Sequence, residues 1–213
     1  AFDGSVNMTR KNPSPGIPPL KRIIDIFLSL LALIVLSPVM LVISLLVLFT
    51  QGTPVFFRQQ RPGYGGEPFF LIKFRTMRNA RPGGDDISQD AARLTSLGKF
   101  LRASSLDELP ELWNILRGEM SLVGPRPLLM QYLPLYSAEQ MRRHDVLPGL
   151  TGWAQVNGRN TLTWEDKFKL DVWYVDHWSI CLDLRIICMT LWKALKREGI
   201  SGQGEATARE WKG

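Results

Sequence analysis

The sequence predicts a mainly α-helical fold with a small β-hairpin (α+β), attached to a membrane by an N-terminal helix that breaks in its middle. Three observations carry this prediction: a long apolar run near the N-terminus, two short apolar runs around a glycine-rich turn, and helical periodicity in the C-terminal third. A chain of 213 residues is long enough for one domain with its own core beside a membrane segment. The stretch before Met8 reads as a cloning remnant, and residues 1–19 are set apart as this remnant and an N-terminal extension.

Residues 23–49 have the composition of a segment that enters a bilayer. As one helix they would measure roughly 40 Å, more than the roughly 30 Å of hydrocarbon to be crossed. Pro38, directly after Ser37, removes a backbone hydrogen bond and bends a helix. The flanks of this run are basic on both sides, with Lys21 and Arg22 before it and Arg58 and Arg61 after it. Because a spanning helix usually has more Lys and Arg on its cytoplasmic side, we expect a re-entrant helix over residues 20–50 rather than a tilted spanning one.

The charged residues and the cysteines limit which partners and sites the sequence allows. Lys21 and Arg22 are expected at lipid phosphates, with Asp25 available to pair with them. The net charge of +6 suits membrane phospholipid, nucleotide phosphate or nucleic acid, but no nucleic-acid-binding motif stands out, so no nucleic acid is expected. Cys181 and Cys188 form no CxxC pair and are expected to be reduced core residues on one helix face.

Residues 55–60 and 68–75 are short apolar runs around Arg-Pro-Gly-Tyr-Gly-Gly, which is typical of a β-hairpin with a glycine-rich turn. No phosphate-binding glycine motif occurs there, so the glycines are assigned to the turn. Residues 78–90, rich in Gly, Asp, Arg and Asn, are expected to form a surface loop.

The C-terminal third predicts two helices, over residues 164–178 and 182–198. The second ends in basic residues followed by Gly199, which suits the negative end of a helix and its stop. The aromatic residues of this region have two interpretations that stay open, core packing and contact with lipid headgroups.

Asp107 and Glu108 are adjacent carboxylates at the expected start of a helix, because Pro110 is tolerated only in a first turn. One interpretation is structural: Ser105 and Glu108 fit a capping box. The other is chemical: adjacent carboxylates repel each other, and Mg²⁺ relieves that repulsion while bridging them to substrate phosphates. Arg126 lies between two prolines in Gly-Pro-Arg-Pro, which suits a rigidly held, fork-shaped hydrogen-bond donor to phosphate.

Taken together and in order, the Ser-Pro-broken helix, Lys-Phe-Arg-Thr-Met, the Asp-Glu pair, Gly-Pro-Arg-Pro and Val-Asn-Gly-Arg-Asn resemble the bacterial sugar transferases. Among these, the chain is most similar to the small monotopic phosphoglycosyl transferases, from about Leu20 to the C-terminus. The resemblance implies an enzyme on the cytoplasmic face of the bacterial inner membrane, with a catalytic domain over residues 51–198 and a tail over residues 199–213. Such enzymes transfer sugar-1-phosphate from a UDP-sugar to polyprenyl (undecaprenyl) phosphate and release UMP, the first membrane step of glycoconjugate assembly. Formation of a homodimer is left open.

The resemblance also implies roles for single residues. Asp107 is expected to attack the β-phosphorus of the UDP-sugar and form a covalent phospho-sugar-aspartate intermediate. Asp107 and Glu108 are expected to bind Mg²⁺, mainly through Glu108. Arg102 joins the expected substrate-binding residues for its position five residues before Asp107. The expected substrate-binding residues are Lys73, Arg75, Arg102, Arg126, Arg159 and Asp183, and the expected membrane residues are Lys21, Arg22, Ser37 and Pro38.

Two other functional hypotheses remain at this stage. In one, lipid phosphate attacks the donor directly and Asp107 is a base or metal ligand. In the other, the chain is a membrane-anchored adaptor without activity, and Asp107 and Glu108 only cap a helix. Leu147 stands where the family usually has Arg or Lys before Pro-Gly, so it is assigned no phosphate contact, and His144 and His177 are assigned structural roles. Residues 202–213 resemble, over a short match, the tail of members that use UDP-linked bacillosamine.

Overall fold

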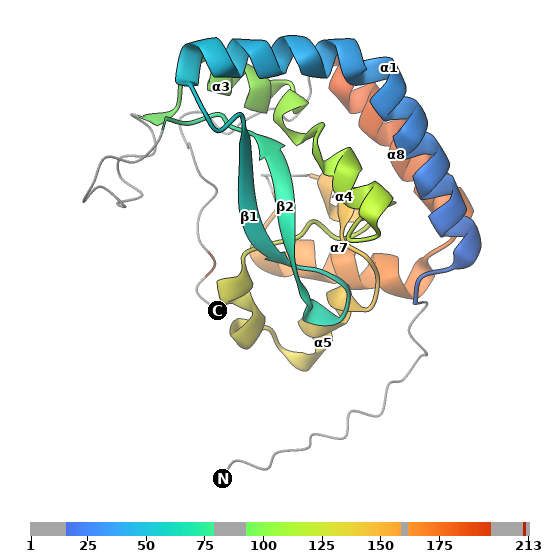
Figure 1. Ribbon diagram of the computed structural model, residues 1–213. Coiled ribbons are helices and arrows are strands. Elements are labelled where there is room, and N and C mark those ends of the chain that lie inside the picture. Colours follow the sequence, from blue (N-terminus) through green and yellow to red (C-terminus); the bar gives the residue numbers. More distant parts are fainter. Residues whose placement is uncertain (1–15, 79–92, 159–161, 197–210, 212–213) are drawn as a thin grey trace.

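The structure is a computed structural model that describes residues 16–78, 93–158, 162–196 and Trp211. A helical domain lies against one side of a long, bent helix, with a two-stranded hairpin beside it (Figure 1). This arrangement confirms the predicted mainly helical fold with a small β-hairpin. The main elements are α1 (Pro19–Gln51), β1 (Phe56–Pro62), β2 (Pro68–Phe74), α3 (Ser96–Ala103), α4 (Glu111–Arg117), β3 (Ser121–Val123), α5 (Ala138–Met141), β4 (Gly149–Thr151), α6 (Trp153–Val156), α7 (Trp164–His177) and α8 (Ile180–Lys196). Short 3-10 helices are η1 (Tyr64–Gly66), η3 (Leu106–Glu108), η4 (Met130–Leu135) and η5 (Arg142–His144).

Helix α1 contains Pro38 and changes direction along its length (Figure 1). Proline has no backbone N–H, so the carbonyl of Ile34, four residues earlier, loses its helical partner. The Ser37 hydroxyl donates to this same carbonyl at 2.8 Å. Ser37 therefore replaces the hydrogen bond that Pro38 removes, and the helix continues through the bend with its backbone satisfied.

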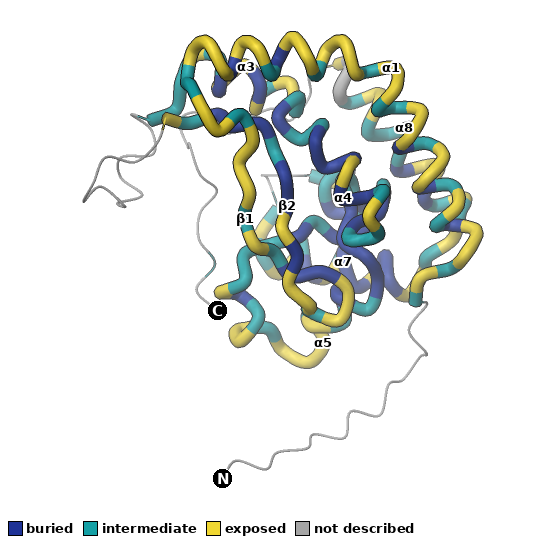
Figure 2. The backbone as a smooth tube through the Cα atoms, viewed as in Figure 1, coloured by how far each residue is buried: buried dark blue, intermediate teal, exposed yellow. Residues whose placement is uncertain are grey.

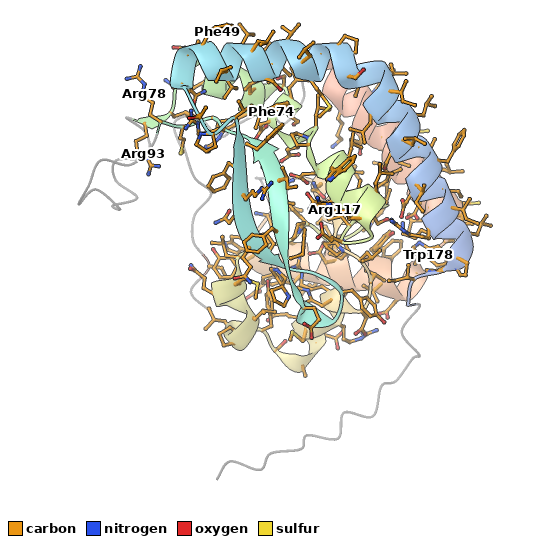
Figure 3. All side chains as sticks on the ribbon, viewed as in Figure 1. Phe49, Phe74, Arg78, Arg93, Arg117 and Trp178 are labelled. Atoms are coloured by element: carbon orange, nitrogen blue, oxygen red, sulfur yellow. The ribbon has the colours of Figure 1, made fainter. Side chains whose placement is uncertain are left out.

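One side of α1 is apolar and exposed along most of the helix (Figure 2). By length and composition alone, α1 is able to cross a membrane. Phe49, near its C-terminal end, is 81% exposed and lies on the side turned away from the domain (Figure 3). The buried residues of α1 are Lys21, Asp25, Ser29, Ile43 and Val47. An apolar face of this size on the described part of the chain suits contact with lipid.

Strands β1 and β2 pair antiparallel from Phe56 opposite Phe74 to Pro62 opposite Pro68, which confirms the predicted hairpin. A second, parallel pair, β3 with β4, was not predicted. Its strands run so close that a Cβ on Gly149 would lie 2.0 Å from the Gly124 backbone nitrogen. Glycine is therefore required at Gly149, and likewise at Gly124, where β3 leads into Gly-Pro-Arg-Pro, because a Cβ there would lie 2.3 Å from the Leu147 carbonyl oxygen.

The apolar core has three parts, and each joins elements that are distant in sequence. One packs Phe74 and Leu101 against Val47 of α1. Another packs β2 against α4 through Leu71, Ile115 and their neighbours. The third, around Val123, Tyr174 and Ile186, joins β3 to α7 and α8. The core thus fixes β2, α4 and β3 relative to one another, which matters because these elements lead into the site.

The two predicted C-terminal helices are confirmed as α7 and α8. Phe168 and Tyr174 are buried, whereas Trp173 and Trp192 are 39% and 59% exposed, so the aromatic residues divide between core and surface. The expectation that Cys181 and Cys188 are core residues is wrong. Both are exposed, because α8 packs through Asp183 and Ile186 and the cysteines lie outside that face.

Candidate active site

Glu108 lies at the centre of a cluster of charged side chains from three elements. Lys73 of β2 places its Nζ 3.0 Å from Glu108 Oε1, and Arg126, which follows β3, donates Nη2 to the same oxygen. The Arg126 side chain is still 42% exposed, while those of Lys73 and Glu108 are 18% and 17% exposed. Two cations therefore converge on one carboxylate at the edge of the domain, with one of them open to solvent.

The backbone around the acid pair differs from the predicted capping box. Ser105 is left-handed, with φ of 56°, and within the described chain its hydroxyl makes no capping hydrogen bond. Asp107 and Glu108 form a separate 3-10 turn, and α4 begins only at Glu111, with Pro110 as its N-cap. The capping-box interpretation is therefore wrong, since the two acids precede the helix instead of capping it.

Glu111 is a third acid of this cluster that the sequence analysis missed. Its Oε1 lies 3.0 Å from Lys73 Nζ, and the residue is 2% exposed. Lys73 is thus shared between Glu108 and Glu111. The available signal was its place in the first turn after Pro110, three residues beyond Glu108, since residues at that spacing face the same side when the chain is helical.

The three carboxyl groups titrate differently. Burial raises the pKa of Asp107 to about 6, and the neighbouring Glu108 charge adds to this, while Lys73, Arg102 and Arg126 act in the opposite direction. Burial would also raise the pKa of Glu108, but Arg126 and Lys73 outweigh it and hold that pKa well below its usual range. Burial raises the pKa of Glu111, with Lys73 opposing. Asp107 is therefore mostly ionised at neutral pH yet poorly solvated.

Two further residues were predicted to bind substrate, Arg102 and Arg159, and the structure describes only Arg102. Arg102 donates Nε to Thr76 Oγ1 at 3.0 Å, and its charge acts on Asp107. Arg102 therefore lies in the same electrostatic environment as Lys73 and Arg126. Arg159, residues 79–90 of the predicted surface loop and all of the predicted tail motif except Trp211 lie outside the described residues.

Arg75 has a different position from the one predicted. It donates Nη1 to the Thr53 carbonyl at 3.0 Å and Nη2 to the Gln51 carbonyl at 2.5 Å, as well as to the Gly52 carbonyl. It is 5% exposed. The reason is that β2 ends at Phe74, so Arg75 does not continue the strand alternation that would align it with Lys73. Arg75 stabilises the C-terminal end of α1, and its assignment as a phosphate ligand is corrected.

Lys21 and Asp183 form a second buried cluster. Lys21 Nζ lies 2.5 Å from Asp183 Oδ2 and 3.0 Å from the Val123 carbonyl. Tyr174 Oη donates to Asp183 Oδ1 at 2.6 Å, and Trp178 Nε1 to Oδ2 at 3.1 Å. Trp178 lies beside the N-terminal end of α1 (Figure 3). The structure therefore places Asp183 in the contact between α1 and the domain, and not among the partners of Glu108.

The expected membrane position of Lys21 is corrected as well, while that of Arg22, which is half-buried, stays a prediction. Lys21 is 7% exposed, and Arg22 donates Nη2 to the Leu116 carbonyl near the end of α4, at 2.9 Å. Asp25 accepts from the Leu122 backbone N–H at 3.1 Å. The physical reason is a polar stripe at helical spacing, Lys21, Asp25 and Ser29, which turns inward toward the domain.

The donor set of the acid pair fits a magnesium ion. Among the described residues, no group of three or more His, Cys, Asp or Glu side chains has a metal-binding arrangement. Mg²⁺ does not need one, because it is commonly bound by one or two carboxylates together with substrate phosphates and water. Burial and then the adjacent Glu108 charge raise the pKa of Asp107, and a divalent cation would relieve the repulsion between the two carboxylates.

Comparison with known proteins gives a consistent picture. The bacterial sugar transferase profile matches residues 18–197. The sugar transferase EpsL of Bacillus subtilis, itself uncharacterized, is 52% identical over 194 residues, covering 91% of this chain and 96% of that protein. The UDP-glucose:undecaprenyl-phosphate glucose-1-phosphate transferase of Xanthomonas campestris is 44% identical over 186 residues, 82% of this chain. The exopolysaccharide production protein ExoY of Sinorhizobium fredii is 39% identical over 191 residues, covering 80% of this chain and 83% of ExoY.

The relatives differ in how much of their own length the chain spans. It corresponds to 38% of the Xanthomonas enzyme and 39% of the enzyme of the same name from Klebsiella pneumoniae. The match to the family profile nevertheless includes all the elements that form the Glu108 cluster, since they lie within residues 18–197. The chain belongs to the bacterial sugar transferase family, whose curated relatives include undecaprenyl-phosphate sugar phosphotransferases, and is a transferase.

Proposed function

We propose that this protein transfers sugar-1-phosphate from a UDP-sugar to undecaprenyl phosphate, producing undecaprenyl diphosphate sugar and UMP. The observation that carries the proposal is buried Asp107 beside Glu108, on which Lys73 and Arg126 converge. Both substrates are phosphates, so fixed cations are needed around the attacking group. The names of several relatives describe this reaction with UDP-glucose as donor.

In the proposed mechanism, a carboxylate oxygen of Asp107 attacks the β-phosphorus of the UDP-sugar. The bond between that phosphorus and the oxygen bridging to the α-phosphorus breaks, and UMP leaves with the electron pair. An oxygen of undecaprenyl phosphate then attacks the same phosphorus and releases the Asp107 carboxylate. A pKa of about 6 keeps Asp107 mostly ionised at neutral pH, while burial leaves it poorly solvated and reactive.

The charged neighbours of Asp107 hold positive charge close to it during both steps. Glu108 holds Lys73 and Arg126 in place, and Arg126 retains exposed surface from which to contact a phosphate. Asp107 and Glu108 would bind Mg²⁺, which when present supplies positive charge that offsets the diphosphate. Glu111 holds Lys73 from the other side, 3.0 Å away. These residues therefore explain how a site containing three acids can accept two anionic substrates.

We further propose that α1 is re-entrant, so that the domain lies on the cytoplasmic face of the inner membrane. Both ends of α1 contact the same domain: Arg22 bonds to Leu116 near the end of α4, and Arg75, just beyond β2, bonds to the backbone of residues 51–53. Strand β2 and α4 are themselves in contact. A helix that crossed the bilayer would place its ends on opposite sides of roughly 30 Å of hydrocarbon.

The donor sugar and the covalent step are tested in one experiment. The purified protein in lipid nanodiscs is incubated with UDP-glucose or UDP-diacetylbacillosamine and Mg²⁺, without acceptor, and its intact mass and UMP release are measured. We expect a phospho-sugar adduct with one donor, lost in Asp107→Asn and retained in the control Asp166→Asn, whose carboxylate is exposed at the start of α7.

Two results would favour the alternatives. Turnover that begins only when undecaprenyl phosphate is added, without an adduct, would indicate direct attack by the lipid phosphate. A protein without turnover on either donor, but with lipid binding intact in Asp107→Asn, would favour the adaptor hypothesis.

A further inference from the structure

Trp211, close to the C-terminus, packs into a cluster of aromatic rings. Its ring stacks on Tyr136, with centroids 5.2 Å apart, and meets Phe168 edge-on at 4.9 Å. Its backbone N–H donates to Tyr132 Oη at 3.2 Å. Phe168 and Tyr132 are 2% and 3% exposed, so Trp211 rests on the interior of the domain. The C-terminal segment thus contributes a side chain to the tertiary structure.

Arg143 contacts two of the same rings. Its guanidinium carbon lies 5.8 Å from the centroids of both Tyr136 and Phe168. The residue is 2% exposed, and its charge is paired with Asp171 at 2.7 Å. Because a buried charge is costly unless its partners stay in place, the position of Arg143 depends on this surrounding cluster.

Arg143 connects the aromatic cluster to the candidate active site. Besides its bonds to Asp171, its Nη2 donates to the backbone carbonyl of Arg126 at 2.8 Å. The side chain of Arg126 in turn donates to Glu108. A continuous series of contacts therefore runs from Trp211 through Tyr136 and Phe168 to Arg143, and from there to the acid pair.

We propose that Trp211 is a positioning residue for Arg126, so that packing of the C-terminal tryptophan determines how well Arg126 is held for substrate phosphate. This inference rests on the proposed function, because it assigns Arg126 to phosphate binding. Trp211 acts through the two rings and Arg143, and does not itself contact the Glu108 cluster in the described structure. Its effect should therefore depend on Arg126 being present.

The test compares Trp211→Ala, the conservative Trp211→Phe and the control Trp173→Ala in nanodiscs. Trp173 is also a stacked tryptophan, 5.2 Å from Trp153 and 4.4 Å from His177, but its partners do not contact Arg143 in the described structure. Two quantities are measured for each variant: hydrogen–deuterium exchange of peptides covering residues 121–131 and 140–146, and kcat/KM for the active UDP-sugar.

We expect faster exchange in both peptides for Trp211→Ala and a loss of kcat/KM of about tenfold, the rate equivalent of one well-packed aromatic pair. Trp211→Phe should keep both the exchange rates and kcat/KM close to those of the native protein, and Trp173→Ala should change neither quantity. In an Arg126→Ala background, Trp211→Ala should cause little further loss, because the group it positions is gone.

Unchanged exchange in residues 121–131, or an equal loss of rate in the Arg126→Ala background, would overturn the inference. If Trp211→Ala does not fold, Trp211→Leu carries the same comparison. The exchange measurement needs no turnover, so the two proposals can fail separately. A protein that uses neither donor but shows faster exchange in Trp211→Ala would refute the proposed function and leave the positioning contact standing.

Discussion

Asn114 provides the most direct test of how the hairpin is held against α4. The residue is fully buried. Its Oδ1 accepts from the Ile72 backbone N–H at 3.1 Å, and its Nδ2 donates to the Phe70 carbonyl at 2.8 Å and to Glu119 Oε2 at 2.6 Å. Because Ile72 directly precedes Lys73, this side chain fixes the register of Lys73 relative to Glu108 and Glu111.

The cost of Asn114→Ala follows from these three bonds. The Ile72 N–H would be buried without a partner, which costs about 1–3 kcal/mol, and the two other bonds contribute about 0.5–1.5 kcal/mol each. The total is about 2–6 kcal/mol, or a fall in Tm of about 4–24 °C for a chain of this size. Asn114→Asp keeps the acceptor for Ile72 but turns the donor atom into a second oxygen facing Phe70 and Glu119.

The assay is thermal unfolding in detergent across pH. The new carboxyl of Asn114→Asp has its pKa raised by burial and by Glu119, so its destabilisation should shrink as pH falls and the group takes up a proton. Asn114→Ala should show no such recovery. The control is Asn157→Ala, which removes one exposed bond to the Trp153 carbonyl and should stay within about 0.5 kcal/mol. A Tm for Asn114→Ala within about 2 °C of the native protein would refute the reasoning.

Three further predictions concern Asp107, Ser37 and Gly149. Burial raises the pKa of Asp107 to about 6, so the Asp107 contribution to stability falls as pH rises from about 4 to about 6 and stays low above that. Asp107→Asn should therefore be more stable than the native protein by about 1–3 kcal/mol at pH 8 in EDTA, and the difference should close below pH 4. Equal stability at pH 8 would contradict this. Ser37→Ala leaves the Ile34 carbonyl without a donor and should lower the free energy of unfolding by about 1 kcal/mol. Ser44→Ala should lower it less, because the Met40 carbonyl keeps its helical N–H, and unfolding of both variants in nanodiscs gives the comparison. Gly149→Ala places a Cβ 2.0 Å from the Gly124 nitrogen and should cost more than about 3 kcal/mol, so normal folding on circular dichroism would count against the close strand contact.

The elements predicted correctly from sequence are those with a local signal. Two short apolar runs around a glycine-rich turn predicted the hairpin, and helical periodicity predicted α7 and α8. The pair of β3 and β4 has no such signal, because its strands are three residues each and lie far apart in sequence. Their pairing depends on the close approach of Gly124 and Gly149, which only the folded chain brings together.

For the site, sequence motifs located the acid pair but not the partners of every charged residue. Lys73, Glu108 and Arg126 come together, whereas Arg75 and Asp183 serve the contacts of α1. A motif places a residue along the chain, but the end of a strand or the inward side of a helix decides what the side chain contacts. Lys21 illustrates this, since a basic residue beside an apolar run was assigned to lipid and instead pairs with a buried acid.

The attachment of both ends of α1 to one domain has a consequence for the membranes in which the protein can work. A spanning helix must match the thickness of its bilayer, and it tilts or distorts the lipid when it does not. Both ends of helix α1 are joined to the folded domain, by Arg22 of the helix itself at one end and by Arg75 of the domain at the other. With α1 re-entrant as proposed, these contacts fix its depth in one leaflet, so we expect turnover to vary little between bilayers of short and long acyl chains.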